Sequence, residues 1–246
     1  MRLCFDYKVY SERLKDIDYE FNIRSGFDWK DSSFPPDQRS IVDEMLNDNP
    51  RIPDWENFVF KRPKDIYGER GMKFTIFDNI RPDDVLQGKC GDCYFLSSLS
   101  ALAENPQKIK DLFITKEVNE AGCYAVNMII NGEKRTVFVD DYFPYDVYNE
   151  EWAFSRPKEV EGRPIEIWVL VLEKVWAKIF GSYQRIEAGL AGEALNTLTG
   201  SPHTFYRHDD LKKPGDFFQE ILRSANCNFP ICAAAASKAS LGVSQA

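Results

Sequence analysis

Apolar positions recur with helical spacing just after residue 92. Phe95, Leu99 and Leu102 fall on one face when the chain is wound as a helix. Asp92 stands where a helix N-cap is expected, and Pro106 marks the end of the pattern. The spacing predicts a helix over residues 93–104.

A second helical pattern covers residues 165–180, and Gly181 follows it as a C-cap. Its predicted buried stripe consists of Ile165, Trp168, Leu172, Trp176 and Ile179. Weaker patterns predict an amphipathic helix over 11–22 and a further helix over 217–224.

Strand-like segments surround the dipeptide Asn131-Gly132. Residues 123–130 and 135–139 are rich in β-branched and apolar side chains. Asn-Gly is a strong signal for a two-residue hairpin turn. The sequence therefore predicts a β-hairpin here, and the apolar run 228–236 predicts a buried strand.

Composition is that of an ordinary folded protein, with 246 residues, 43% hydrophobic side chains and 28% charged ones. The net charge of −8 argues against nucleic acid, whose binding needs a basic face. The sequence shows no 18-residue apolar run and no secretory signal, which predicts no membrane span and a cytoplasmic location. We therefore expect its six cysteines to be free thiols.

The chemistry is concentrated in residues 87–96, which read QGKCGDCYFL. Cys93 opens the predicted helix, where backbone N–H groups and the helix dipole favour a thiolate. Gln87 precedes it by six residues and is placed to donate its side-chain amide to an oxyanion, with the Cys93 N–H as second donor. Gly88 and Gly91 allow close backbone approach. A single cysteine at a helix start is more often simply packed, but this combination is more specific.

Motifs in order along the chain resemble the calpain family of papain-like cysteine proteases over residues 27–246. Gln87, Gly88, Gly91, Asp92 and Cys93 match the nucleophile motif, with Tyr94 where the family usually has tryptophan. The other matching segments are Phe34-Pro35-Pro36, 60–63, 139–144, 166–168, 172–174, 177–178, 181–183 and 198–200.

The resemblance implies an α+β, papain-like fold of two lobes with a cleft between them. Residues 1–26 would be an N-terminal extension, 27–200 a complete first lobe, and 201–246 the start of an incomplete second lobe. It also implies cleavage of peptide bonds in protein substrates. Gly189 would pair through its backbone with an extended substrate.

The family's catalytic histidine and asparagine belong to the second lobe, but no His-Ala-Tyr or Asn-Pro-Trp segment is present. The histidines present, His203 and His208, follow Cys93 too closely in sequence to replace the family histidine. We therefore expect Cys93 to lack its general base and its orienting residue within this chain. The chain is expected to be a piece of a longer product, inactive alone.

Calcium is implied by the same resemblance. The family's first-lobe site matches Asp84 and Glu166 as carboxylate ligands, and Phe77 and Asn79 as carbonyl ligands. Asn79 replaces a glycine. Mixed oxygen donors suit Ca²⁺. In the competing interpretation these carboxylates are solvated or paired with Arg81 or Arg163.

Three other interpretations stay open. Cys90 and Cys93 could form a redox pair of thioredoxin type. Cys90, Cys93, Cys227 and Cys232 could hold a structural zinc ion. The chain could also keep the calpain fold as a non-proteolytic binding or regulatory module.

Overall fold

The computed structural model describes residues 23–24, 26–43, 45–46, 51–207 and 214–234. The chain divides into two compact units, Met1–Thr204 and Phe205–Ala246, and each is described by itself. The helix predicted over 11–22 lies outside the described residues. The lobe boundary predicted at residue 200 stays a prediction.

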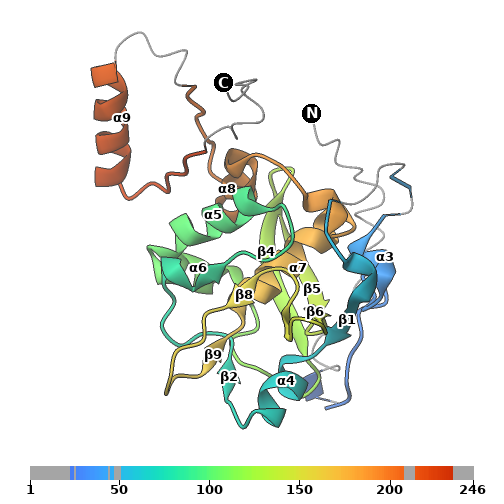
Figure 1. Ribbon diagram of the computed structural model, residues 1–246. Helices are drawn as coiled ribbons and strands as arrows, with labels where there is room; N and C mark the ends of the chain where they lie inside the picture. The colour runs from blue at the N-terminus through green and yellow to red at the C-terminus, as the bar shows by residue number, and fades with distance from the viewer. Residues whose placement is uncertain (1–22, 25, 44, 47–50, 208–213, 235–246) are drawn as a thin grey trace, which may run out of the picture. The chain divides into compact units, whose positions relative to one another are not determined.

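The first unit mixes short helices with small sheets, in agreement with the expected α+β class (Figure 1). Its elements in chain order are α3 (Gln38–Ile41), β1 (Phe58–Lys61), α4 (Pro63–Glu69), β2 (Phe74–Thr75), β3 (Val85–Leu86), α5 (Cys93–Ala103), α6 (Pro106–Leu112), β4 (Cys123–Ile130), β5 (Glu133–Asp140), β6 (Phe143–Asp146), β7 (Glu151–Trp152), β8 (Arg156–Pro157), β9 (Ile165–Glu166), α7 (Trp168–Phe180) and α8 (Ala191–Thr199). The strands pair as β1-β6-β7, β2-β9, β3-β8 and β4-β5.

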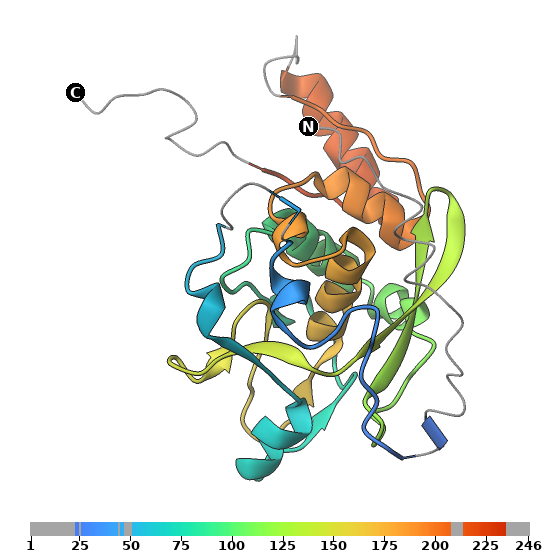
Figure 2. The ribbon, with the colours of Figure 1, turned by 90° about the vertical axis from the view of Figure 1, so that its right-hand side faces the viewer.

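The hairpin predicted around Asn131-Gly132 is confirmed as β4 and β5, an antiparallel pair that runs alongside α7 (Figures 1 and 2). Asn131 and Gly132 have φ of 51° and 81°. A turn with positive φ at both central residues matches the twist of the flanking strands, and asparagine and glycine tolerate it best. Local turn chemistry therefore sets this register.

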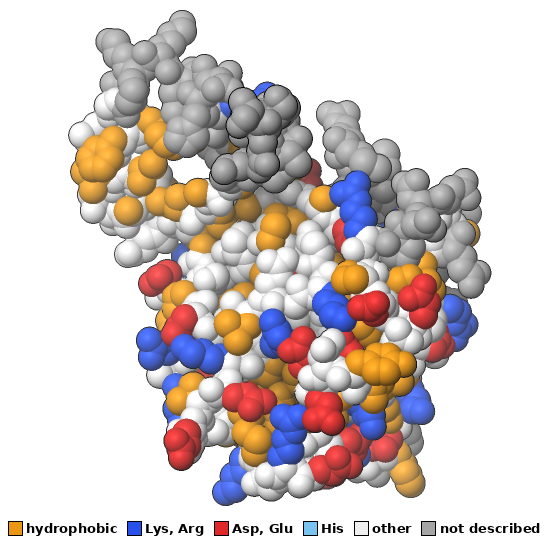
Figure 3. All heavy atoms as spheres, in the orientation of Figure 1, with side chains coloured by type: hydrophobic (Ala, Val, Ile, Leu, Met, Phe, Trp, Pro, Cys, Tyr) orange, Lys and Arg blue, Asp and Glu red, His pale blue; other side chains and the backbone are white. Residues whose placement is uncertain are grey.

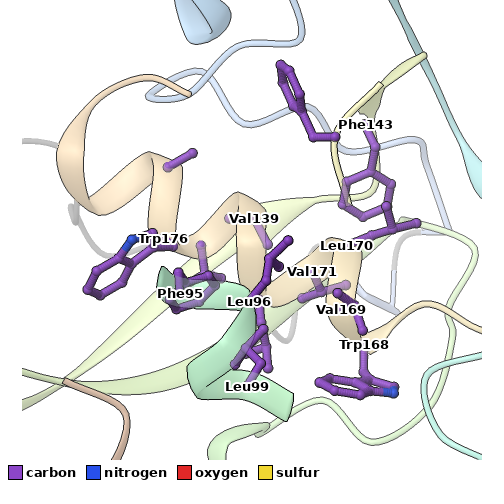
Figure 4. Packing of buried hydrophobic residues seen from close by; sticks show 14 of the residues in the cluster. Phe95, Leu96, Leu99, Val139, Phe143, Trp168, Val169, Leu170, Val171 and Trp176 are labelled. Atoms are coloured by element: carbon purple, nitrogen blue, oxygen red, sulfur yellow. The ribbon is translucent and has the colours of Figure 1, made fainter. Parts of the chain in front are cut away.

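Helices α5 and α7 form the centre of the hydrophobic core. Phe95 of α5 stacks on Trp176 of α7 with ring centroids 4.7 Å apart and planes 8° from parallel. Figure 4 shows the α5 side chains against those of α7 and β5. The predicted helix over 93–104 is confirmed as α5, and its apolar face is buried as expected.

The second predicted helix begins later than expected. Ile165 and Glu166 form β9, which pairs in parallel with β2, and α7 starts at Trp168. The prediction of helix at residues 165–167 was therefore wrong, because the Ile165 and Ile167 N–H groups donate across to the Lys73 and Thr75 carbonyls. The C-cap prediction is confirmed by Gly181, with φ of 109°.

Helix α7 is buried on all sides rather than along one stripe, since every residue from Trp168 to Ile179 is buried. Its charged side chains therefore need partners inside the protein. Lys178 Nζ lies 2.5 Å from Asp31 Oδ2, and Lys174 Nζ pairs with Asp140. The Asp31 N–H donates to Asp140 Oδ2 at 2.7 Å. This network ties the segment before α3 to α7 and the end of β5.

The second unit contains α9 (Pro214–Asn226), which confirms the helix predicted over 217–224. Its described surface includes the exposed side chains of Phe218 and Leu222. The strand predicted over 228–236 is wrong, because described residues 228–234 form neither helix nor strand. A strand needs a pairing neighbour, and the described part of this unit supplies none.

Acidic and basic side chains are intermixed over the face seen in Figure 3, and neither sign gathers into a continuous patch. Within the described residues, no helix combines the length and apolar character needed to cross a membrane.

Candidate active site

The loop that leads into α5 is anchored at several points. The Lys89 N–H donates to the Ala153 carbonyl at 2.8 Å, and Lys89 Nζ pairs with Asp146 Oδ2 at 2.7 Å. A Cβ at Gly88 would lie 2.0 Å from the Phe154 carbonyl oxygen, so only glycine allows this approach. The backbone path toward Cys93 is therefore fixed by contacts with residues 146–154.

Cys93 is the first residue of α5, and its side chain is exposed. The Asp92 carbonyl accepts the Phe95 N–H at 2.8 Å, which starts the helix. The first N–H groups of a helix have no partner within it and favour a negative charge nearby. The thiol thus stands at a position that can hold an anion and is open to a substrate.

Gln87 lies in the same loop, exposed, directly after β3. Its Nε2 donates to the Cys90 carbonyl at 2.9 Å. A side-chain amide has two N–H bonds, so this contact orients the group and leaves the second for a substrate oxygen. Arg156 holds the other side of the residue by donating to the Gln87 carbonyl at 3.1 Å.

Asp92 occupies the N-cap position but does not cap the helix with its side chain. The expectation that it would was wrong. Its carboxyl group is fully buried and interacts with the carboxyl of Glu173 on α7. The helix start is therefore held by backbone carbonyls, and the Asp92 side chain is directed into the core.

Gly189 lies against the residue that follows the nucleophile. A Cβ at Gly189 would come within 2.4 Å of the Tyr94 ring, and the neighbouring Ala188 N–H donates to the Gly91 carbonyl at 3.0 Å. Ala188 and Gly189 are exposed. The structure thus brings the 188–189 loop beside the loop that leads to Cys93.

Neither histidine is described as a partner of Cys93. His203 packs on α8, where a Cβ at Gly192 would lie 2.3 Å from the imidazole ring. His208 is outside the described residues.

The two carboxylates assigned to calcium do lie together. Asp84 and Glu166 line one small pocket, together with Lys158, Val160, Arg163 and Pro164. Burial raises the pKa of each carboxyl group, and each is raised further by nearby carboxylates. Two buried carboxylates that repel one another are stabilised by a cation between them.

Some carboxylate oxygens of this pocket already accept hydrogen bonds from the backbone. Asp84 Oδ2 accepts the Arg81 N–H at 2.6 Å, and Glu166 Oε1 accepts the Asn79 N–H. Glu166 Oε2 is buried without a hydrogen-bond partner among the described residues. Arg163 lies 3.5 Å from the Glu166 carboxylate. The donor set therefore fits a hard cation, with Arg163 as a competing positive charge.

The carbonyl ligands expected from Phe77 and Asn79 lie on the same loop as the Asn79–Glu166 contact. The Phe77 carbonyl accepts the Thr75 hydroxyl at 3.2 Å, which leaves its second lone pair available.

Comparison with known proteins decides the relationship. The family described as calpain family cysteine protease matches residues 29–245. The chain belongs to the calpain family. The calpain-type cysteine protease ADL1 of Oryza sativa subsp. japonica is 37% identical over 173 residues, which cover 69% of this chain and 8% of that protein.

Other calpains show similar identities. The calpain-type cysteine protease DEK1 of Arabidopsis thaliana is 36% identical over 173 residues, 69% of this chain and 8% of its own length. Calpain-13 of Rattus norvegicus is 31% identical over 172 residues, 69% of this chain and 24% of its own length. The chain thus spans at most about a quarter of these relatives.

Calpain membership weakens the competing interpretations of the cysteines, and the geometry adds to this. Cys90 and Cys93 are both free, Cys90 buried with its Sγ 3.7 Å from the Tyr183 carbonyl oxygen, and Cys93 exposed. Burial raises the pKa of the Cys90 thiol well above its ordinary value, which makes it inert. Within the described residues of the first unit, no group of three or more His, Cys, Asp or Glu side chains is arranged to hold a metal ion.

Sequence reasoning missed one feature of this calpain site, the contact between Asp92 and Glu173. Both residues were matched to family motifs, but a separation of 81 positions carries no periodic signal. An available signal was the glutamate in the middle of a mostly apolar helix pattern, because such a residue needs a buried partner.

Proposed function

We propose that this calpain domain carries the nucleophile of a cysteine endopeptidase. The observation that supports the proposal most directly is the exposed Cys93 thiol on the first residue of a buried helix, behind an anchored loop that holds Gln87. Cys93 is assigned as the nucleophile. The Gln87 amide and the Cys93 N–H are assigned as donors to the oxyanion of the tetrahedral intermediate.

In the proposed reaction, the thiolate sulfur attacks the carbonyl carbon of the scissile peptide. The C–N bond breaks, the leaving amine takes the proton that came from the thiol, and water then releases the acyl group. A histidine must carry that proton, and an asparagine must orient the histidine. We propose that both come from sequence outside these 246 residues. Gly189 would pair with the extended substrate backbone.

The arrangement of lobes belongs to the same proposal. Residues 27–200 would form the first papain-like lobe, and 201–246 the beginning of the second, with protein substrates bound between complete lobes in the cytoplasm. The alternative is a non-proteolytic calpain module, in which no histidine acts as the base for Cys93.

A peptidyl electrophile tests the proposal on the chain itself. A short extended peptide that ends in an epoxide should alkylate Cys93 faster than the same epoxide without a peptide, because a cleft beside Gly189 would hold the backbone. Mass spectrometry of proteolytic fragments identifies the modified cysteine. Cys227 is the internal control, since it is also exposed but lies on the other unit.

The enhancement should disappear in Cys93→Ala and persist in Cys227→Ala. Equal modification of Cys93 and Cys227, with no benefit from the peptide, would contradict a substrate-binding cleft and favour the non-proteolytic module.

For calcium, we propose that Asp84 and Glu166 bind Ca²⁺ with the Phe77 and Asn79 carbonyls. The supporting observation is the buried Glu166 Oε2, which has no hydrogen-bond partner among the described residues and belongs to the pocket that the two carboxylates share. A bound Ca²⁺ would neutralise these carboxylates and hold β9 and the loop before β3 together.

Calorimetric titration with Ca²⁺ should give binding heat for the wild type and none for Asp84→Ala or Glu166→Gln. Asp83→Asn is the matched control, since Asp83 is the exposed neighbour that pairs with Lys158 instead. Unchanged binding by Asp84→Ala would remove Asp84 from the ligand set.

A further inference from the structure

Two carboxyl groups interact in the core, and one of them belongs to the residue that precedes Cys93. Asp92 precedes the nucleophile in sequence, Glu173 lies in the middle of α7, and their side chains are 0% and 1% exposed. Burial of an isolated carboxylate is strongly unfavourable. Unlike Asp140 and Asp31, neither has a lysine or arginine partner among the described residues.

Of the two carboxyl groups, Glu173 accepts hydrogen bonds and Asp92 accepts none from the described residues. Glu173 Oε1 accepts the Ser155 N–H, and Oε2 accepts the Ser155 hydroxyl, both at 2.8 Å. Neither Asp92 oxygen receives a hydrogen bond from a donor in the described residues. The side chain that interacts with the Asp92 carboxyl is the carboxyl of Glu173.

Two ionised carboxylates have only acceptors to offer each other, so this contact becomes a hydrogen bond only when one of them carries a proton. We propose that Asp92 and Glu173 share a proton, and that this carboxyl pair positions the start of α5 and limits negative charge beside Cys93. The positioning role rests on the proposed function of Cys93 as nucleophile. The shared proton rests on the burial of both carboxyl groups and on the Asp92 oxygens, which have no hydrogen-bond donor among the described residues.

The surroundings favour the protonated pair. Burial raises the pKa of Asp92 to about 7 and that of Glu173 well above its ordinary value. Other titratable groups that interact with the pair are Cys90, Tyr94 and Tyr183. None of these three side chains is cationic. The negative charge of Glu187 acts on Cys90 and raises the pKa of its thiol. Carboxyl pairs in contact titrate in two separated steps because both groups cannot ionise together.

The consequence for Cys93 follows from the position of Asp92. A full negative charge on the preceding side chain would oppose formation of the thiolate and cancel part of the effect of the helix N-terminus. A proton held between Asp92 and Glu173 keeps that charge partly neutralised near neutral pH. The pair thus affects the charge state of Cys93 and is not itself a catalytic group.

Infrared spectroscopy tests the shared proton. At about pH 6 ordinary carboxyl groups are ionised, so the wild type should still show the C=O stretching band of a protonated acid. Asp92→Asn and Glu173→Gln should each remove this band, because the new amide donates to the remaining carboxylate without a shared proton. Glu187→Gln, which changes a nearby carboxyl outside the pair, should retain it. A band that survives both pair variants would overturn the proposal.

Alkylation of Cys93 by iodoacetamide tests the positioning role without peptide hydrolysis. Glu173→Gln leaves a full charge on Asp92 and should slow alkylation near neutral pH by about 3- to 10-fold. The double variant Asp92→Asn/Glu173→Gln removes the charge and keeps a hydrogen-bonded pair, so its rate should return at least to that of the wild type. Equal rates in all three proteins would overturn the positioning role.

The pH dependence of stability gives a second readout of the same proton. The folded pair retains a proton that unfolded carboxyls release, so its contribution to the free energy of unfolding falls as pH rises from 3.8 to about 7. The double variant should lose that part of the slope. These measurements need no protease activity, so a failure of the proposed endopeptidase function would remain distinguishable from a failure of the pair.

Discussion

Replacing Cys93 with alanine is expected to lower peptide hydrolysis by about 10⁴-fold or more in the protein that also carries the histidine and asparagine. The reason is that the sulfur forms the covalent bond of the acyl intermediate, and no other described nucleophile stands at the start of α5. The oxyanion donors and the substrate surface would remain, which accounts for any residual rate. Hydrolysis of an unfolded protein substrate gives the measurement.

Cys227→Ala is the control, because it removes another exposed thiol and leaves the α5 site intact. A thermal unfolding curve for Cys93→Ala should match the wild type, since the side chain is exposed and makes little packing contribution. Retained hydrolysis in Cys93→Ala would refute the assignment of the nucleophile. Full activity of the 246 residues alone would refute the proposal that the base comes from outside them.

Replacing Lys178 with methionine is expected to lower the free energy of unfolding by about 3–5 kcal/mol. Lys178 Nζ donates to Asp31 Oδ2 at 2.5 Å and to the Phe138 carbonyl at 2.6 Å, and both charged side chains are 1% exposed. Burial lowers the pKa of Lys178, which shows that the site disfavours an isolated charge. Methionine fills similar volume but leaves the Asp31 carboxylate buried and unpaired. Urea denaturation measures the loss.

Two further variants isolate the charge effect. Asp31→Asn in the Lys178→Met background removes the uncompensated charge and keeps an oxygen for the Ser33 and Phe34 N–H groups, so it should recover part of the stability. Lys158→Met breaks an exposed pair with Asp83 and should have little effect. A loss in Lys178→Met no greater than in Lys158→Met would contradict a buried, energetically important ion pair.

The elements that could be predicted depend mainly on neighbours in sequence. The hairpin follows from Asn131-Gly132, whose positive φ angles need those residue types. Helix α5 follows from its apolar spacing, and Gly181 ends α7 because a left-handed cap favours glycine. Local pattern and local conformation agree in each case.

Predictions failed where distant partners decided the outcome. Ile165 continues the helical pattern of α7, yet it is drawn into β9 by hydrogen bonds to residues beside β2. Asp92 is an ordinary N-cap by sequence, but its buried side chain makes no cap hydrogen bond and interacts with Glu173 instead. Residues 228–234 are apolar enough for a strand, and the described part of their unit contains no strand to pair with them.

By itself the sequence determined the calpain family, the nucleophile candidate Cys93 with its loop, and the main helices and hairpin. These depend on residue types within short segments, and such local patterns do not depend on distant contacts. Only the tertiary structure decided which charges meet in the core, namely Lys178 with Asp31 and Asp92 with Glu173. The physical reason is that pairing across 81 to 147 positions is set by packing, and burial then forces each polar group to find a partner.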